Sequence, residues 1–240
     1  VMGDFLDNQV LIIKTAWGGK SLYRDFRPPS SGGDVGPYYK RMVADVREAL
    51  ANLKTYFPGY DGGGYELAGF VWYHGWNDGV SPKTGVVQYE TNLVNLIRDI
   101  RAEFGVPNLP VVIGTTAMAN ASGDQLLICA AQAAVANPVL HPEFAGTVFT
   151  VDARPFDYGQ LLGMGTEGYH WFWNAESYFN IGQSMGLGMM SLLSSPPAVT
   201  NSPATSITTT SAVLNATLAC PGLFPARRAN RRPRQGVYGL

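Results

Sequence analysis

The sequence predicts a three-layer α/β domain over residues 1–195, in which helices cover both faces of a parallel sheet. Two observations predict it. Short apolar runs alternate with longer amphipathic segments along this part of the chain, and the short runs are apolar throughout rather than at every second residue. Strands of that kind are typical of parallel sheets buried on both faces. The chain is long enough for such a domain, with 240 residues of which 46% are apolar and 15% charged.

The first half of the domain is expected to contain two strands, each followed by a helix. The β-branched run QVLIIKTA predicts a strand over 9–16. Apolar residues at helical spacing predict a helix over 38–56, which a Phe-Pro-Gly turn signal ends. The run GFVWYH predicts a strand over 69–74, and a segment with one apolar and one charged face predicts a helix over 87–104.

The same alternation continues in the second half of the domain. The expected strands are LPVVIG at 109–114 and TVFTVDA at 147–153, and the expected helices cover 124–136 and 176–193. Ligands of parallel sheets bind beyond the carboxyl ends of the strands, so the loops that follow the strands should carry the chemistry. These loops are 17–36, 75–85, 115–123 and 154–173.

Residues 196–240 differ from the domain in composition. Residues 196–219 are rich in Ser, Thr, Pro and Ala, which predicts a linker and the start of a β-sandwich-like module. Residues 220–240 form a basic tail with five of the 17 basic residues, which leaves twelve basic against 18 acidic residues before it, a net charge of -6. The tail fits a disordered or out-of-frame segment, or one that binds nucleic acid or a membrane surface.

The composition excludes several classes of protein. A formal net charge of -1 argues against nucleic-acid binding by the chain as a whole, so no nucleic-acid partner is expected. The two cysteines, Cys129 and Cys220, are too few for a disulfide scaffold or a cysteine-based zinc site. No apolar run reaches the roughly 18 to 20 residues that cross a bilayer.

Asn77 is a candidate donor to a developing oxyanion. It follows the strand expected at 69–74, and Gly75 just before it lets the backbone turn tightly, so that the Asn77 amide can point into the cleft. The alternative interpretation is an Asn-Asp turn cap. The glycines of the Trp17–Ser21 loop (WGGKS) stand in the equivalent place after the strand expected at 9–16, and their uncovered backbone N–H groups suit the same task.

His170 is the candidate general base. Histidine is the usual base at neutral pH, and Glu167, three residues earlier, could orient its ring. The alternative is a packed, hydrogen-bonded histidine among aromatic residues. Three other patterns are discounted: GMGTEG at 163–168 does not open a helix directly after a strand, GQSM at 182–185 falls inside an expected helix, and the three histidines lack a metal-ligand spacing.

Taken together, these loops resemble the SGNH hydrolases, and most closely the sialate O-acetylesterase-like group, also described as carbohydrate esterase family 6. VLIIKTAWGGKSL resembles the second block of that family, GFVWYHGWND the third with G-x-N-D at Gly75–Asp78, and the Glu167–His170 stretch the fifth. The resemblance implies a flavodoxin-like fold and removal of acetyl groups from sugars such as sialic acid or xylan. It implies serine acyl transfer, for which no metal or cofactor is needed.

The resemblance also assigns roles to individual residues. The Gly19 N–H and the Asn77 amide would form the oxyanion hole, and His170 would be the base. Glu167 stands at the acid position of a block that reads D-x-x-H in the family, with Asp152 or Asp157 as possible substitutes. The residues expected to contact the acetylated carbohydrate substrate are His74, which stands where relatives often have Gln, Lys20 and Trp76.

One block of the family is missing. The first block, G-x-S with the nucleophilic serine, would lie upstream of Val1, and the serines of the active-edge loops, Ser21, Ser30, Ser31 and Ser81, lack a strand-to-helix elbow. The chain is therefore expected to be an inactive fragment of an esterase. Because the first strand of a flavodoxin-like sheet is central, its loss should leave strand edges unpaired. A secreted or periplasmic location is expected from the family alone.

The alternative function is glycan binding without turnover. Five tryptophans fall in or beside the active-edge loops and could stack on sugars, although at least two of them are expected in the core. They are Trp17, Trp72, Trp76, Trp171 and Trp173.

Overall fold

The computed structural model describes residues 1–240 except 81, 117–122, 162–167, 195–197, 206–212 and 220–240. Its α-helices are α1 Met2–Phe5, α2 Pro37–Ala51, α3 Leu53–Tyr56, α4 Trp76–Val80, α5 Lys83–Glu103, α6 Asp124–Val135, α7 Tyr158–Leu161 and α8 Ala175–Ser194. Its strands are β1 Phe70–Tyr73, β2 Val111–Gly114, β3 Val148–Val151, β4 Ala198–Thr205 and β5 Val213–Ala219. Short 3-10 turns cover η1 Pro29–Ser31, η2 Pro142–Phe144, η3 Arg154–Phe156 and η4 Gly168–Trp173.

The predicted α/β class is confirmed. Strands β1, β2 and β3 form a parallel sheet in that order, with Phe70 opposite Val111 and Val111 opposite Val148. Every residue of β2 is buried, which explains its continuous apolar sequence. Val111 and Ile113 pack into the hydrophobic cluster on one face of the sheet, and Val112 packs into the cluster on the other.

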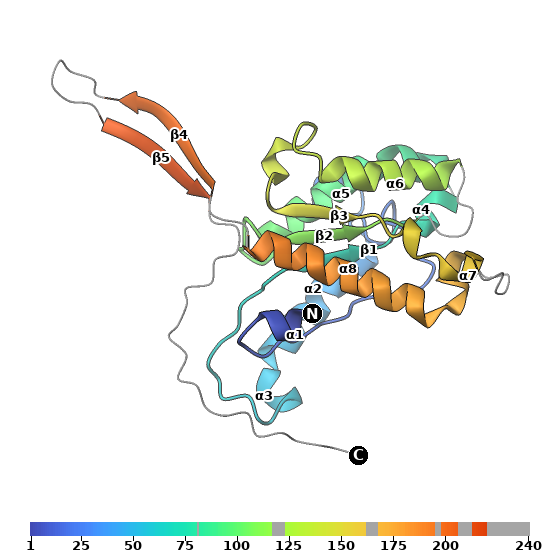
Figure 1. Ribbon diagram of the computed structural model, residues 1–240, viewed down its shortest axis with the longest axis horizontal. Coiled ribbons are helices and arrows are strands. Elements are labelled where there is room, and N and C mark those ends of the chain that lie inside the picture. Colours follow the sequence, from blue (N-terminus) through green and yellow to red (C-terminus); the bar gives the residue numbers. More distant parts are fainter. Residues whose placement is uncertain (81, 117–122, 162–167, 195–197, 206–212, 220–240) are drawn as a thin grey trace.

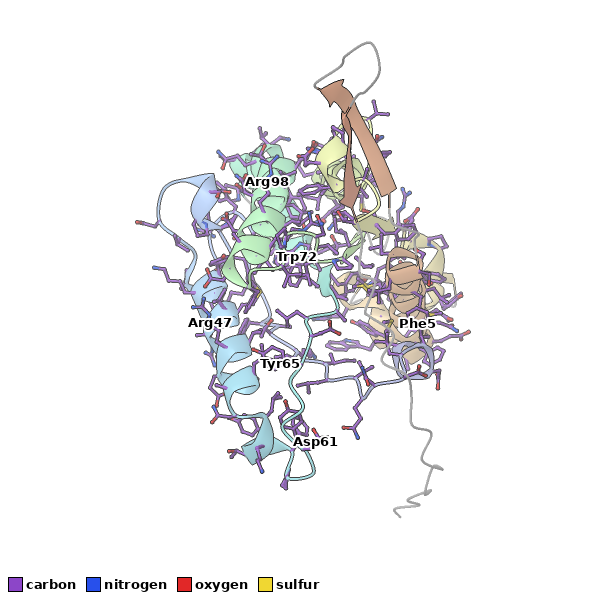
Figure 2. The ribbon with its side chains drawn as sticks, turned by 90° about the vertical axis from the view of Figure 1, so that its left-hand side faces the viewer. Phe5, Arg47, Asp61, Tyr65, Trp72 and Arg98 are labelled. Atoms are coloured by element: carbon purple, nitrogen blue, oxygen red, sulfur yellow. The ribbon has the colours of Figure 1, made fainter. Side chains whose placement is uncertain are left out.

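Helices cover both faces of the sheet (Figure 1). The apolar sides of α2, α5 and α6 fill the larger cluster, in which Tyr89, Leu93 and Ile97 of α5 are fully buried. Helix α8 lies on the opposite face, and α1 packs beside it through Met2 and Phe5. In Figure 2, Trp72 of β1 lies between Phe5 on the α8 side and the side that α2 and α5 form.

The strand expected at 9–16 is wrong. The segment has no regular structure, Ile12 is 81% exposed, and no backbone hydrogen bond joins 9–16 to another described residue. A β-branched run becomes a strand only where a neighbouring strand satisfies its backbone groups. Strand β1 pairs with β2 alone, and among the described residues 9–16 does not pair with its other edge, so the backbone groups of 9–16 have no strand partner.

The segment after α8 contains two strands, as the sequence predicts. Strands β4 and β5 pair antiparallel, with Ala198 opposite Ala219. The assignment of 196–219 to a β-sandwich-like module stays a prediction, and the basic tail at 220–240 lies outside the described residues. Among the described residues, the helices are too short or too polar for any of them to span a bilayer.

Candidate active site

The carboxyl end of β1 turns sharply into α4, and Gly75 makes that turn. Its φ is +153°, and a Cβ there would lie 2.8 Å from both the Ile128 and the Thr116 side chains. Only glycine fits so close to two other elements. The turn places Asn77 in the first turn of α4 at the edge of the sheet where the sequence predicts the cleft.

Buried polar side chains fix the peptide just before this turn. The His74 carbonyl oxygen accepts a hydrogen bond from the Tyr89 hydroxyl and another, of 2.8 Å, from the Gln132 amide. Gln132 also accepts the backbone N–H of Thr116 at 3.2 Å, and the Trp72 indole donates to the Tyr89 hydroxyl at 3.3 Å. Burial raises the pKa of Tyr89, so its hydroxyl stays protonated and can donate.

Asp78 joins this turn to the loop that carries Gly19. Its carboxylate is buried and accepts the backbone N–H groups of Leu22 and Tyr23, each at 2.8 Å. Burial raises the pKa of Asp78, and the nearby His74 and the two backbone donors oppose that shift. Asp78 therefore makes a tertiary contact with backbone more than fifty residues earlier in the chain, rather than the local turn cap that the alternative interpretation describes.

His74 provides a second link between the same two loops. Its Nε2 lies 2.7 Å from the Lys20 carbonyl oxygen, and because a carbonyl only accepts, Nε2 carries the proton. Its Nδ1 is buried without a hydrogen-bond partner among the described residues and lies 3.9 Å from the Asp78 carboxylate. Burial lowers the pKa of His74, so the ring is neutral near pH 7. His74 therefore holds the Lys20 loop in place, and its predicted contact with the substrate stays a prediction.

The two predicted oxyanion donors have different surroundings. Gly19 is exposed, has a φ of +67° and has open space around its Cα, so its backbone N–H is accessible. Asn77 is half-buried, and its amide makes no hydrogen bond to another described residue. The contacts of Asp78 and His74 bring their two loops together, but no contact between Gly19 and Asn77 themselves is established.

Lys20 and Trp76 contact protein rather than open cleft. The Lys20 ammonium lies 4.5 Å from the centre of the Tyr38 ring, a cation–π arrangement. Trp76 is half-buried and packs against the cluster under α8, and its carbonyl oxygen accepts the Gln125 amide at 2.9 Å. Both residues remain candidates for substrate contact through the parts of their side chains that are exposed.

His170 lies in η4, at the same end of the sheet as α4 (Figure 1). Its neighbour Trp171 is buried in the cluster under α8, and Trp76 packs against that same cluster, so the third-block and fifth-block segments share one set of packing contacts. The His170 ring lies against the Trp173 ring, with 4.2 Å between centres and the ring planes tilted by 34°, and the His170 carbonyl oxygen accepts the Tyr178 hydroxyl at 3.0 Å. His170 is half-buried, as a base that meets a substrate needs to be.

Three acidic residues, Glu167, Asp152 and Asp157, are the candidates for the acid that would orient His170. Glu167 lies outside the described residues. Asp152 is bound by Arg154, with oxygen–nitrogen distances of 2.6 and 2.8 Å, and this interaction lowers the pKa of Asp152. Asp157 is buried. Of the two possible substitutes, Asp152 is therefore already neutralised by a neighbouring cation.

The serines of the active-edge loops are held in other contacts. Ser21 is fully buried and donates to Asp25 at 3.0 Å. The Ser30 hydroxyl donates to Asp99, and the Ser31 hydroxyl accepts the Asn95 amide at 3.1 Å. None of the three contacts a histidine through these bonds, and the expectation that they are not nucleophiles stays a prediction. Ser81 lies outside the described residues.

The tryptophans divide as the sequence predicts. Trp72 and Trp171 are core residues, with 5% and 1% exposure, whereas Trp173 is 65% exposed. Sequence reasoning missed the roles of Tyr89 and Gln132. A signal for Gln132 was present: it lies seven residues after Gln125 on an otherwise Ala-rich, apolar helix, which places two buried amides on one helix face.

Comparison with protein-family models gives one match. The model described as carbohydrate esterase, sialic acid-specific acetylesterase, covers residues 3–190. A comparison with curated proteins finds no match. Among solved structures, an X-ray structure of a protein from Arabidopsis thaliana is similar, with 20% sequence identity and a TM-score of 0.47 over 73% of this chain. The match covers 57% of that protein, so the chain spans a little over half of its length.

Proposed function

Because the chain belongs to the sialic acid-specific acetylesterase family of carbohydrate esterases, we propose that it carries the oxyanion-binding and general-base parts of a serine esterase that removes acetyl groups from sugars. The observation that carries the proposal is the pair of links, through Asp78 and His74, between the Gly19 loop and the Asn77 turn. Two donor loops held together at the carboxyl edge of a parallel sheet suit a tetrahedral oxyanion.

In this proposal the residues act in a set order. A serine hydroxyl attacks the acetyl carbonyl carbon while His170 Nε2 or Nδ1 takes the hydroxyl proton. The carbonyl oxygen becomes an oxyanion, which accepts hydrogen bonds from the Gly19 N–H and the Asn77 amide. When the ester C–O bond breaks, the imidazolium returns the proton to the leaving sugar oxygen. Water then attacks the acetyl-serine in the same way and releases acetate.

The hydrogen bonds that hold Ser21, Ser30 and Ser31 support a nucleophile other than these three serines. The proposal therefore assigns the nucleophile to a G-x-S block of the family's kind, outside residues 1–240. An acetylated carbohydrate is the substrate class in this proposal, and a secreted or periplasmic location belongs to it as well.

The test has two arms. In the first, the 240-residue chain is incubated with acetylated xylan and with O-acetylated sialic acid, and acetate is measured; we expect no release. In the second, a family strand with G-x-S is fused before Val1. Acetate release that requires the added serine, Asn77 and His170 supports the proposal. A folded fusion without release, or release by the unfused chain that depends on His170, contradicts it.

A further inference from the structure

Trp173 differs from the other tryptophans of the chain because most of its surface faces solvent. It is 65% exposed, and the His170 ring lies 4.2 Å from its own, measured between ring centres. Single exposed apolar side chains are common on protein surfaces, and Phe179 is 69% exposed. Trp173 is distinguished by its contact with the candidate base His170 and by the strained backbone on which it lies.

The backbone of η4 is forced into the conformation that exposes this ring. Trp171, Phe172 and Trp173 have φ values of 53°, 54° and 57°, in the left-handed region that residues with a side chain rarely adopt. Such strain persists where the surroundings impose it, and it concentrates at active sites and ligand contacts. Here Trp171 is buried under α8, and Phe172 packs directly on Gly159 of α7, where a Cβ would overlap it. With these two side chains anchored, the next one points outward.

The outward ring is also held in orientation. One face contacts His170, whose carbonyl oxygen is bound by the Tyr178 hydroxyl. The ring is thus a rigid aromatic surface next to the candidate base, and a rigid surface binds a ligand at low entropic cost. No lysine or arginine occurs in residues 155–226, so this part of the chain offers an apolar contact rather than an ion pair to a sugar carboxylate.

We propose that Trp173 is a substrate-binding platform on which a pyranose ring of the glycan stacks beside His170. One side of a pyranose presents C–H groups, which match an aromatic face, while the hydroxyl groups at its edge stay hydrated. The inference rests on the proposed function for the identity of the ligand, and it adds a binding residue outside the oxyanion loops and the base. Stacking there would hold the acetyl-bearing sugar, or its neighbour in the glycan, next to the reacting ester.

Binding to the complete 240-residue chain tests the platform without requiring hydrolysis. The probes are acetylated xylo-oligosaccharide and O-acetylated sialic acid, followed by indole N–H signals in NMR spectra. We expect Trp173→Ala to weaken binding about tenfold or more, and Trp173→Phe, which keeps an aromatic face, to lose much less. The matched control is Phe179→Ala on α8, whose side chain is 69% exposed and has no assigned role; this variant should bind as the unmodified chain does.

The outcomes separate the two proposals. Unchanged affinity in a Trp173→Ala variant with an unchanged thermal midpoint overturns the platform, as does an equal loss in Phe179→Ala. Absence of binding by the unmodified chain to both sugars overturns it as well. Trp173-dependent binding of either sugar supports it even if the serine fusion releases no acetate, in which case only the esterase proposal fails.

Discussion

The two halves of the candidate site are held by different forces. On the oxyanion side, the turn after β1 and the Gly19 loop are joined by buried hydrogen bonds through Asp78 and His74. On the base side, His170 directly precedes a left-handed segment, Trp171–Trp173, that is fixed mainly by the packing of Trp171 and Phe172. Hydrogen bonds are directional and orient the groups that they join, whereas packing sets a position without fixing a bond angle. The difference predicts that the two sides respond to different substitutions.

The largest effect should come from breaking the oxyanion side at Asp78. Asp78→Ala leaves the N–H groups of Leu22 and Tyr23 buried without acceptors, so we expect the free energy of unfolding to fall by about 2–5 kcal/mol. Urea titration measures this. The control is Asp45→Ala, because Asp45 is an exposed carboxylate that meets Arg41 at 3.5 Å and should cost less than about 1 kcal/mol. If Asp78→Ala and Asp45→Ala lowered the free energy of unfolding equally, the Asp78 hydrogen bonds would not stabilise the contact between the two loops.

A smaller effect is expected when the base side is disturbed at Gly159. Gly159→Ala places a methyl group against the Phe172 side chain, so η4 must shift, at a cost of roughly 1–3 kcal/mol. Because the two sides are held separately, the amide exchange rates of Leu22 and Tyr23 should stay unchanged while the Trp173 fluorescence changes. Gly182→Ala is the control, since nothing lies within 4 Å of a Cβ there. Faster exchange at Leu22 in Gly159→Ala would mean that the two sides are coupled.

The sequence located the parallel sheet and the turn after β1 from local pattern. Asn77 follows an apolar run that ends at one edge of the sheet, and β1 confirms that this run is a strand. Gly19 follows the run at 9–16, which is not a strand, and His170 lies in a long loop after β3, so the roles of these three residues stay predictions. The strand at 9–16 failed because a strand depends on a partner that may lie anywhere in the chain, and β1 pairs only with β2. Asp78 looked like a local cap, and only the tertiary structure shows that it binds residues 22 and 23.

The free energy of unfolding should depend on pH through His74, on the oxyanion side. Burial lowers the pKa of His74 below its ordinary value of 6.5, so the unfolded chain binds more protons there than the folded protein does. The stability associated with neutral His74 is present above pH 6.5 and is lost as the pH falls through the lowered pKa. His74→Gln keeps a donor for the Lys20 carbonyl and does not titrate, so its free energy of unfolding should decline less between pH 7.5 and 5.5. If the free energy of unfolding declined equally with pH in His74→Gln and in the unmodified chain, the neutral, buried ring of His74 would be contradicted. The control for general effects is His141→Gln, at a histidine outside the site.

The smallest effect is expected at Arg154, and it tests how the base is completed. Its ion pair with Asp152 is about half exposed on both sides, so Arg154→Ala should change the free energy of unfolding by less than about 1 kcal/mol. The same change removes the cation that lowers the pKa of Asp152, so this pKa should rise toward its ordinary range. NMR titration of the Asp152 carboxyl carbon measures the rise. If Asp152 oriented His170, the serine fusion would lose activity in Asp152→Asn and keep it in Arg154→Ala. Because Arg154 already occupies both carboxylate oxygens, we expect instead that Asp152→Asn leaves acetate release intact, which leaves Glu167 and Asp157 as the candidates for the acid.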